Sequence, residues 1–233
     1  MIKQKSFKER VKESVIQCAG AYKSYYVDYE YLICSSAFTK NCYYIISAHE
    51  DNYLHLTGVH TVLDAATFFE KCLEGTLQES DFDFCKSNQS ERDVKGSVRR
   101  KINSLPSIMS MLSTDTFVEE DFSKNRIRCA LAAGSVSATL GFVVVEKAKP
   151  MTLLKGNELD ETKSEKIEIV LRRKAGDDKF TDIFSGDVSK LKERKEVLSD
   201  LLSDDLLSKI SDSGDNDNPI DFVRILGGEN DDK

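Results

Sequence analysis

RIRCALAAGSVSATLGFVVVEKA, residues 126–148, decides the fold class that the sequence predicts. The stretch contains two runs, 126–134 and 137–148, that are rich in aliphatic and β-branched side chains and are separated by a very short link. Such runs are typical of β-strands, and a link this short joins strands that run antiparallel. Two more strand-like runs follow at 165–175 and 179–186. The second half of the chain therefore predicts an antiparallel sheet rather than alternating strand and helix units.

The first half of the chain mixes helical and extended patterns. Apolar residues recur at helical spacing over 6–22, which predicts an amphipathic first helix. Two aromatic and β-branched runs, at 29–37 and 41–50, are separated by a short polar turn and predict a hairpin. A third extended piece is expected over 52–56, ending at Thr57-Gly58, where glycine permits a tight reversal of the backbone.

Residues 61–77 carry the pattern of an amphipathic helix. At its expected start Thr61 serves as the N-cap, and Asp64 follows three residues later in an acidic position that often accompanies such a cap. One stripe at helical spacing holds Val62, Ala65, Phe69 and Leu73. We expect this stripe and the adjacent Phe68 to face the core.

Two further helices are expected, one before the main strands and one after them. Over residues 90–105 the helical stripe holds Val94, Val98, Ile102 and Leu105, and Pro106 should end or kink the helix. Over residues 187–210 a charged segment carries Leu191, Leu198, Leu202 and Leu206, which predicts a C-terminal helix. The expected fold class is therefore α+β, with helices packed on one face of an antiparallel sheet, an N-terminal helix, and a C-terminal helix followed by an acidic tail.

Charge separates the end of the chain from its body. Residues 199–233 hold ten of the 40 acidic and three of the 33 basic side chains, so residues 1–198 carry 30 of each and are neutral. We expect residues 1–211 to form a single α+β domain, because 233 residues are enough to bury a substantial core. Residues 212–233 are expected to be a flexible acidic tail, in which the apolar stretch 219–226 is a docking segment.

Several classes of protein are excluded by composition. The sequence has no apolar run near the roughly 20 residues that cross a bilayer, and its start lacks the apolar core of a signal peptide, so we expect a cytoplasmic protein without membrane contact. Its six cysteines show neither CxxC pairs nor zinc-finger spacing and are expected to be reduced thiols. P-loop, GxGxxG and GxSxG motifs are also missing, and the oligomeric state is not defined.

All three histidines lie within residues 49–60, as His49, His55 and His60. In an extended strand His55 and Thr57 would share one face, and the unpaired amides of the following helix start would favour an anion such as phosphate. Imidazole changes charge near neutral pH, so a histidine beside a phosphate is able to exchange protons with ribose oxygens. The cluster therefore predicts a phosphate-transfer site.

A phosphate-transfer site also needs fixed cations and backbone that a ligand can approach closely. Arg99, Lys101 and Lys155 are the basic candidates, and Gly58 and His60 lie beside the expected helix start. The HxxxxH spacing offers no third ligand nearby, so we expect neither a metal nor a cofactor.

Five short segments resemble one known family. They are NYLHLTGV (52–59), ATFFEKCLEGTL (66–77), Lys101 ahead of Leu105, TLGFVVV (139–145) and PMTLLK (150–155). Over roughly residues 25–185 the chain is similar to the fourth group of phage-associated nucleases related to barnase, EndoU, colicin and RelE. The resemblance implies an α+β fold and a metal-independent endoribonuclease of a phage or other mobile element. It places the HLTG block on residues 55–58 and the basic helix position on Lys101.

The resemblance also implies roles for individual residues. RNA would be cleaved by attack of the ribose 2′-hydroxyl on the adjacent phosphate, with His55 as general acid or base. Thr57 would hydrogen-bond a phosphate oxygen and Lys101 would stabilise the charge of the transition state. We expect RNA as the partner, contacted further by Gly58, His60, Arg99 and Lys155.

Two alternatives stay open at this point. The chain is also compatible with a catalytically inactive, nuclease-like binding protein that acts on a host partner or meets an inhibitory protein, with the acidic tail as its contact. An enzyme resembling ADP-ribosyltransferases is the other alternative, in which a histidine and a threonine hold a ribose and Glu146 or Glu168 assists.

Overall fold

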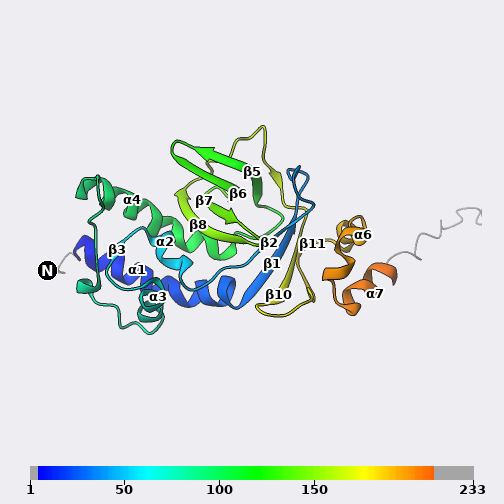
Figure 1. Ribbon diagram of the computed structural model, residues 1–233, viewed down its shortest axis with the longest axis horizontal. Helices are drawn as coiled ribbons and strands as arrows, with labels where there is room; N and C mark the ends of the chain where they lie inside the picture. Colours follow the sequence, from blue (N-terminus) through cyan, green and yellow to red (C-terminus); the bar gives the residue numbers. More distant parts are fainter. Residues whose placement is uncertain (1–4, 213–233) are drawn as a thin grey trace, which may run out of the picture.

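The computed structural model describes residues 5–212, which form a curled nine-stranded sheet, a small two-stranded sheet and helices packed against them (Figure 1). The order in the large sheet is β11-β10-β1-β2-β8-β7-β6-β5-β9, and the small sheet pairs β3 with β4. The strands are β1 Tyr29–Cys34, β2 Tyr44–Ile46, β3 His60–Thr61, β4 Phe82–Asp83, β5 Phe117–Lys124, β6 Ile127–Gly134, β7 Ala138–Val144, β8 Ala148–Lys155, β9 Glu165–Lys166, β10 Ile169–Lys174 and β11 Asp182–Gly186. The predicted α+β class is confirmed.

In the described part of the chain, four α-helices precede β5 and three follow β11, and both groups lie beside the large sheet (Figure 1). The α-helices are α1 Phe7–Tyr22, α2 Asn52–Thr57, α3 Ala65–Leu73, α4 Glu91–Ser104, α5 Val188–Lys192, α6 Lys195–Leu198 and α7 Asp204–Asp212. Shorter turns are the π-helical η1 Lys23–Val27 and the 3-10 segments η2 Glu79–Asp81, η3 Leu105–Ser110 and η4 Ser199–Leu201. None of the helices within residues 5–212 is both long enough and apolar enough to span a bilayer. The predicted tail beyond α7, with its docking segment 219–226, lies outside the described residues.

The hairpin of β6 and β7 confirms the strands predicted from residues 126–148. Its antiparallel register places Leu131 opposite Phe142. The strands on either side, β5 and β8, were not predicted. β5 is rich in acidic residues, and β8 contains Pro150 at an irregularity of the ladder, where the missing proline N–H is tolerated. All neighbouring strands pair antiparallel except β2 and β8, which meet in parallel at Ile46 and Ala148.

The run at 165–175 forms two strands rather than the single one that was predicted. β9 pairs with β5 at one end of the sheet, whereas β10 pairs with β1 near the other end. Between them the Ile167 N–H donates to the Thr116 carbonyl and the Glu168 N–H donates to the Cys34 carbonyl. One continuous segment thus bridges the two ends of the curled sheet.

Helix α1 begins where its sequence predicts. The Ser6 hydroxyl accepts from the Glu9 N–H while the Glu9 carboxylate accepts from the Ser6 N–H, which is a complete capping box. Its buried face includes Val11, Val15 and Tyr22, which pack in the main core with α3, α4 and the inner face of the sheet. The predicted stripe of α4 is buried as well, and the α-helix ends two residues before Pro106.

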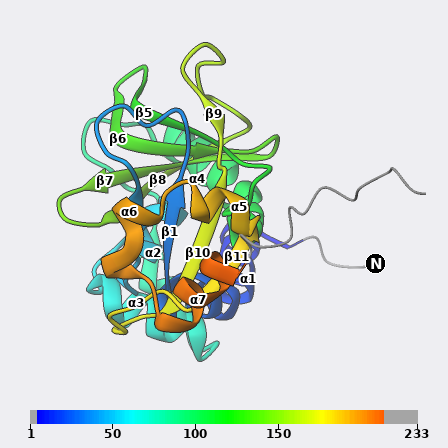
Figure 2. The same cartoon turned by 90° about the vertical axis from the view of Figure 1, so that its right-hand side faces the viewer.

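A second core lies on the opposite face of the sheet. In β1 the side chains of Tyr31 and Ile33 enter the main core, while those of Leu32 and Cys34 enter the second one. Helices α5, α6 and α7 cover that face in front of β1 and β10 (Figure 2). The four leucines predicted for a helix over 187–210 are all buried there, but the segment breaks into short helices and turns because it wraps the curved sheet.

Two further local predictions are wrong. Residues 52–57 form helix α2 instead of an extended strand, so His55 and Thr57 do not share a face by strand alternation. Helix α3 is capped by Asp64, whose carboxylate accepts from the Thr67 N–H, rather than by Thr61. The helix therefore starts after Val62, which is 88% exposed, and Leu73 at its end is 41% exposed, so neither lies on the buried stripe that was predicted.

A buried ion cluster ties β1 to β10 and to the turn before β8. The Glu30 carboxylate accepts two hydrogen bonds from the Arg173 guanidinium, at 2.9 and 2.7 Å, and pairs with the Lys147 amine at 2.5 Å. Glu30 and Arg173 are only 4% and 6% exposed. Desolvation alone would raise the pKa of Glu30, but hydrogen bonds from Lys147, Ser47 and Arg173 overcome it, so that this pKa lies below its usual value.

Glu30→Gln should therefore destabilise the protein strongly, because it leaves a buried guanidinium without its countercharge. We expect a loss of about 3 kcal/mol in the free energy of unfolding, measured by urea denaturation at pH 7. Glu13→Gln breaks the exposed ion pair with Lys5 and is the matched control, for which a loss below about 1 kcal/mol is expected. Equal losses in the two variants would contradict a structural role for the cluster.

Candidate functional site

The end of α2 is shaped by a threonine and a glycine. The Thr57 side chain is fully buried, and its hydroxyl donates to the Leu54 carbonyl at 2.8 Å. Gly58 follows with a φ of +74°, and its N–H donates to the same carbonyl. This left-handed residue turns the chain out of α2 toward β3. Thr57 was predicted to contact phosphate, and here its hydroxyl is used to close the helix.

Lys101 of α4 lies directly against this turn. A Cβ at position 58 would stand 2.7 Å from the Cδ atom of Lys101, so only glycine leaves room for the lysine stem. The Lys101 amine continues past the helix end and donates to the carbonyl oxygen of His55 at 2.6 Å. The structure thus brings His55, Gly58 and Lys101 together, and His55 contributes its backbone carbonyl, not its ring, to the contact.

The Lys101 amine is poised to change charge near neutral pH. Desolvation, followed by repulsion from the Lys86 charge, lowers the pKa of Lys101 from 10.5 to about 8. At pH 7 most molecules therefore carry an ammonium group there that is weakly hydrated and partnered by a neutral carbonyl. Such a group attracts an anion more strongly than a solvated surface lysine does.

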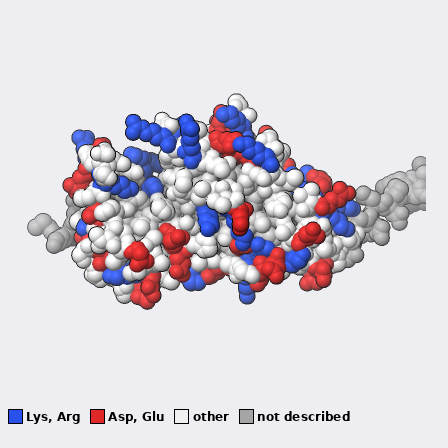
Figure 3. All heavy atoms as spheres, in the orientation of Figure 1, with Lys and Arg blue, Asp and Glu red and all other residues white. Residues whose placement is uncertain are grey.

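A cationic hollow of about 350 Å³ opens beside Lys101. Its walls are α4 with Ser97, Arg100 and Lys101, the β5–β6 turn with Lys124, Asn125 and Ile127, and the stretch from Thr152 through Lys155 to Glu158. Lys124 is neutralised by Glu158 at 2.8 Å, whereas Arg100, Lys101 and Lys155 have no carboxylate partner within residues 5–212. Lys and Arg side chains gather over α4 and the tip of this hairpin (Figure 3). The hollow suits an anionic ligand.

Of the other predicted site residues, only Lys155 lines this hollow. His55 is exposed, and its ring makes no hydrogen bond or ion pair in the described part of the chain. Arg99 lies on another flank of α4, with its guanidinium 5.1 Å from the centre of the Phe7 ring. The ring of His60 is paired with the Asp83 carboxylate.

Arg100 and Asn125 of the hollow were not predicted. Arg100 adjoins Lys101 in the run RRK, but sequence spacing alone did not indicate which arginine of that run faces the same hollow. Asn125 occupies the β5–β6 turn with a φ of +54°, a conformation that asparagine tolerates better than most residues. The place of Asn125 beside the hollow can be recognised only once β5 and β6 are known to pair.

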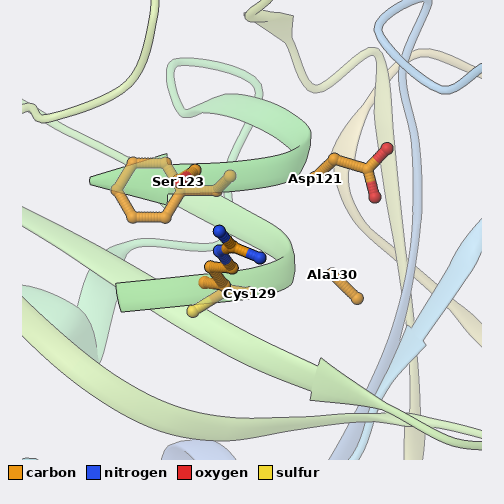
Figure 4. A pocket seen from close by; sticks show the side chains of 6 residues that line it. Asp121, Ser123, Cys129 and Ala130 are labelled. Atoms are coloured by element: carbon orange, nitrogen blue, oxygen red, sulfur yellow. The ribbon is translucent and has the colours of Figure 1, made fainter. Parts of the chain in front are cut away.

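A second hollow, on the outer face of the β5–β6 hairpin, lacks such a convergence of charges. In Figure 4 the Asp121 carboxylate points away from Ser123 and Cys129. Asp121 is paired with Lys40 at 2.5 Å, and burial raises the pKa of the Cys129 thiol, which makes it less reactive. Within residues 5–212 no group of three or more His, Cys, Asp or Glu side chains is arranged to hold a metal ion.

Comparison with known proteins places this α+β chain in a nuclease class. The chain belongs to the phage-Barnase-EndoU-ColicinE5/D-RelE like nuclease4 family, whose model matches residues 14–202. The resemblance seen in the sequence is thereby confirmed, and membership supports a nuclease function in the broad sense. No curated protein and no solved structure matches the chain.

Gly58→Ala should displace the Lys101 stem in addition to straining the backbone. Both costs lower the free energy of unfolding, and the backbone part alone is about 1 to 2 kcal/mol for a left-handed residue. Gly75→Ala is the matched control, since Gly75 has a φ of +72° but no neighbouring atom lies within 4 Å of the place that its Cβ would take. We expect a larger loss for Gly58→Ala in urea denaturation, and we expect Lys101→Ala to remove the excess in the double variant. Equal losses at the two glycines would contradict the contact.

Proposed function

We propose that the protein is a metal-independent endoribonuclease that cleaves RNA at the hollow beside Lys101. One observation carries the proposal: Lys101, whose pKa is lowered to about 8, lines the same hollow as Arg100 and Lys155, and none of the three pairs with a carboxylate within residues 5–212. Three positive groups around one cavity are suited to a phosphodiester and to the additional negative charge of its transition state. Membership in a nuclease family gives independent support.

RNA is favoured as the substrate because it carries its own nucleophile. A base removes the proton from the ribose 2′-hydroxyl, the O2′–P bond forms, and the P–O5′ bond breaks as an acid protonates the leaving oxygen. The products are a 2′,3′-cyclic phosphate and a 5′-hydroxyl end. This chemistry needs proton transfer and charge stabilisation, both of which protein side chains supply.

Lys101 would stabilise the pentacoordinate phosphorus, and Arg100 and Lys155 would bind the nonbridging oxygens. An imidazole would exchange the protons, and His55 was the candidate from the sequence. It is exposed and its own carbonyl contacts the Lys101 amine, which keeps it near the charge. We leave Thr57 out of the proposed reacting groups because its buried hydroxyl already bonds to the Leu54 carbonyl.

The cytoplasm of a cell that carries a phage or other mobile element is the proposed place of action. RNA is abundant there, and the thiols of Cys42 and Cys85 are free and exposed, which is compatible with a reducing compartment. If the protein cleaves no RNA but binds a host or inhibitory protein, a role as a binding protein would replace the nuclease proposal.

Lys101→Ala should reduce RNA cleavage about 100- to 1,000-fold, because removing one preorganised charge from a transition state has costs of this size. The assay is total RNA incubated with the protein in EDTA, followed by mapping of the new ends, which should carry cyclic phosphates. Lys192→Ala, at an exposed lysine of α5 outside the hollow, is the control and should cleave like the wild type. Cleavage that is unaffected by Lys101→Ala, or that requires added metal, would contradict the proposal.

The rate should also fall at high pH. The Lys101 amine is charged below its pKa of about 8 and neutral above it, so kcat/KM should decline from about pH 8 upward as the ammonium is lost. Lys101→Arg carries a guanidinium that stays charged throughout this range, so the decline should disappear even if the rate is lower. The measurement is initial cleavage rates between pH 6 and about 9.5; a decline that persists unchanged in Lys101→Arg would assign it to another group.

A further inference from the structure

The His60 ring is held by a carboxylate from a distant part of the chain. Strands β3 and β4 pair so that His60 lies opposite Asp83, and the His60 Nδ1 atom is 2.9 Å from the Asp83 Oδ1 atom. The backbone N–H of Cys85 also donates to this carboxylate oxygen at 2.8 Å. Asp83 is therefore fixed from two sides, and the imidazole that it contacts has a defined orientation.

This contact decides which ring nitrogen carries the proton. Hydrogen bonds from the Cys85 amide first, and from His60, hold the pKa of Asp83 below its usual value, so the carboxylate is ionised at neutral pH and is only an acceptor. Nδ1 must then be the donor, and the Nε2 atom of neutral His60 keeps its lone pair. The His60 side chain is 47% exposed, so much of the ring is accessible to a ligand.

Two short chain connections link the His60–Asp83 pair to residues that act on Lys101. His60 follows Gly58, which touches the lysine stem, by two residues, and two residues span at most about 7 Å. Lys86 follows Asp83 by three residues, and its charge acts on the Lys101 amine. Strands β3 and β4 are thus each connected, within two or three residues, to a residue that acts on Lys101.

We propose that His60, oriented by Asp83, is the residue that accepts the 2′-hydroxyl proton, and that Asp83 is its positioning residue. The inference rests on the proposed endoribonuclease function and assigns the proton transfer within it. His55 lacks an orienting partner in the described residues, whereas His60 has the arrangement in which a carboxylate fixes the tautomer of a catalytic imidazole. His60 was predicted to bind substrate, and Asp83 was not predicted at all.

The step balances with the groups at hand. Nε2 of His60 takes the proton from the 2′-hydroxyl, the O2′–P bond forms, and the P–O5′ bond breaks. A water molecule protonates the O5′ atom as it leaves, while the Lys101 ammonium stabilises the charge on phosphorus. The imidazolium then returns its proton to water, so that His60 regains its starting state.

The test is the cleavage of a fluorescent RNA oligonucleotide in EDTA by five single variants, which are His60→Ala, Asp83→Asn, His55→Ala, Lys101→Ala and the control Asp81→Asn. His60→Ala should lower kcat about 100- to 10,000-fold, and added imidazole should restore part of the rate, because a free base then replaces the missing ring. Asp83→Asn should lower kcat at least about 10-fold with little change in KM, since an amide no longer imposes one tautomer. His55→Ala should lower kcat less than His60→Ala does.

Asp81→Asn is the matched control for Asp83→Asn. It removes an aspartate charge two positions earlier that is paired with Lys71 at 3.0 Å, so it reports what loss of a local ion pair does to the same loop. We expect near wild-type rates for it, and melting curves of all variants check that they fold.

Three results would overturn the inference. They are full activity in both His60→Ala and Asp83→Asn while Lys101→Ala is silent, a loss in His60→Ala that imidazole does not restore, and a larger loss in His55→Ala than in His60→Ala. Each leaves the endoribonuclease proposal standing. Absence of RNA cleavage by the wild type in the same assay would instead overturn that proposal and the inference with it.

Discussion

The close approach of the Lys101 side chain to the backbone at Gly58 is the constraint on which the candidate site depends. Because residue 58 has a positive φ and no side chain, α2 can end against α4, and the lysine stem fills the space of the missing Cβ. The stem carries the amine past the helix end to the His55 carbonyl. Gly58 therefore fixes the position of the Lys101 amine. Arg100 and Lys155 line the same hollow as Lys101, so all three are placed to contact one anion.

Holding the Lys101 ammonium against the end of α2 costs free energy because the charge is partly desolvated. The same desolvation favours the phosphate contact that we propose. Desolvation disfavours the ammonium form, which is why the pKa of Lys101 falls to about 8. The same low local dielectric strengthens its attraction to a phosphate. The stability that offsets such a site comes from elsewhere, above all from the two cores on opposite faces of β1.

Sequence periodicity predicted the helices and strands that bury one regular row of apolar side chains. It failed where helical spacing and strand alternation fit the same residues equally well. Helices α1 and α4 and the β6–β7 hairpin are long enough for one pattern to win. In the six residues of α2, alternation separates Tyr53, His55 and Thr57 from the leucines, yet helical spacing buries Tyr53, Leu56 and Thr57. Packing of α2 against β8 and α4 selects the helix. The short strands β3 and β4 have no periodicity to detect, because each contains two residues.

The same limit explains which atoms of the site were predictable. The HLTG block was interpreted through its side chains, but the structure uses the His55 carbonyl, the Thr57 hydroxyl toward Leu54, and the absence of a side chain at Gly58. Backbone groups are common to all sequences, so no pattern of residue types reveals them. Asp83 was missed for a related reason: it lies 23 residues from His60, and only the register of β3 against β4 makes them partners. For a candidate site built on helix ends and short strands, the sequence therefore indicates which positions are involved. It does not indicate which atoms of those residues make the contacts.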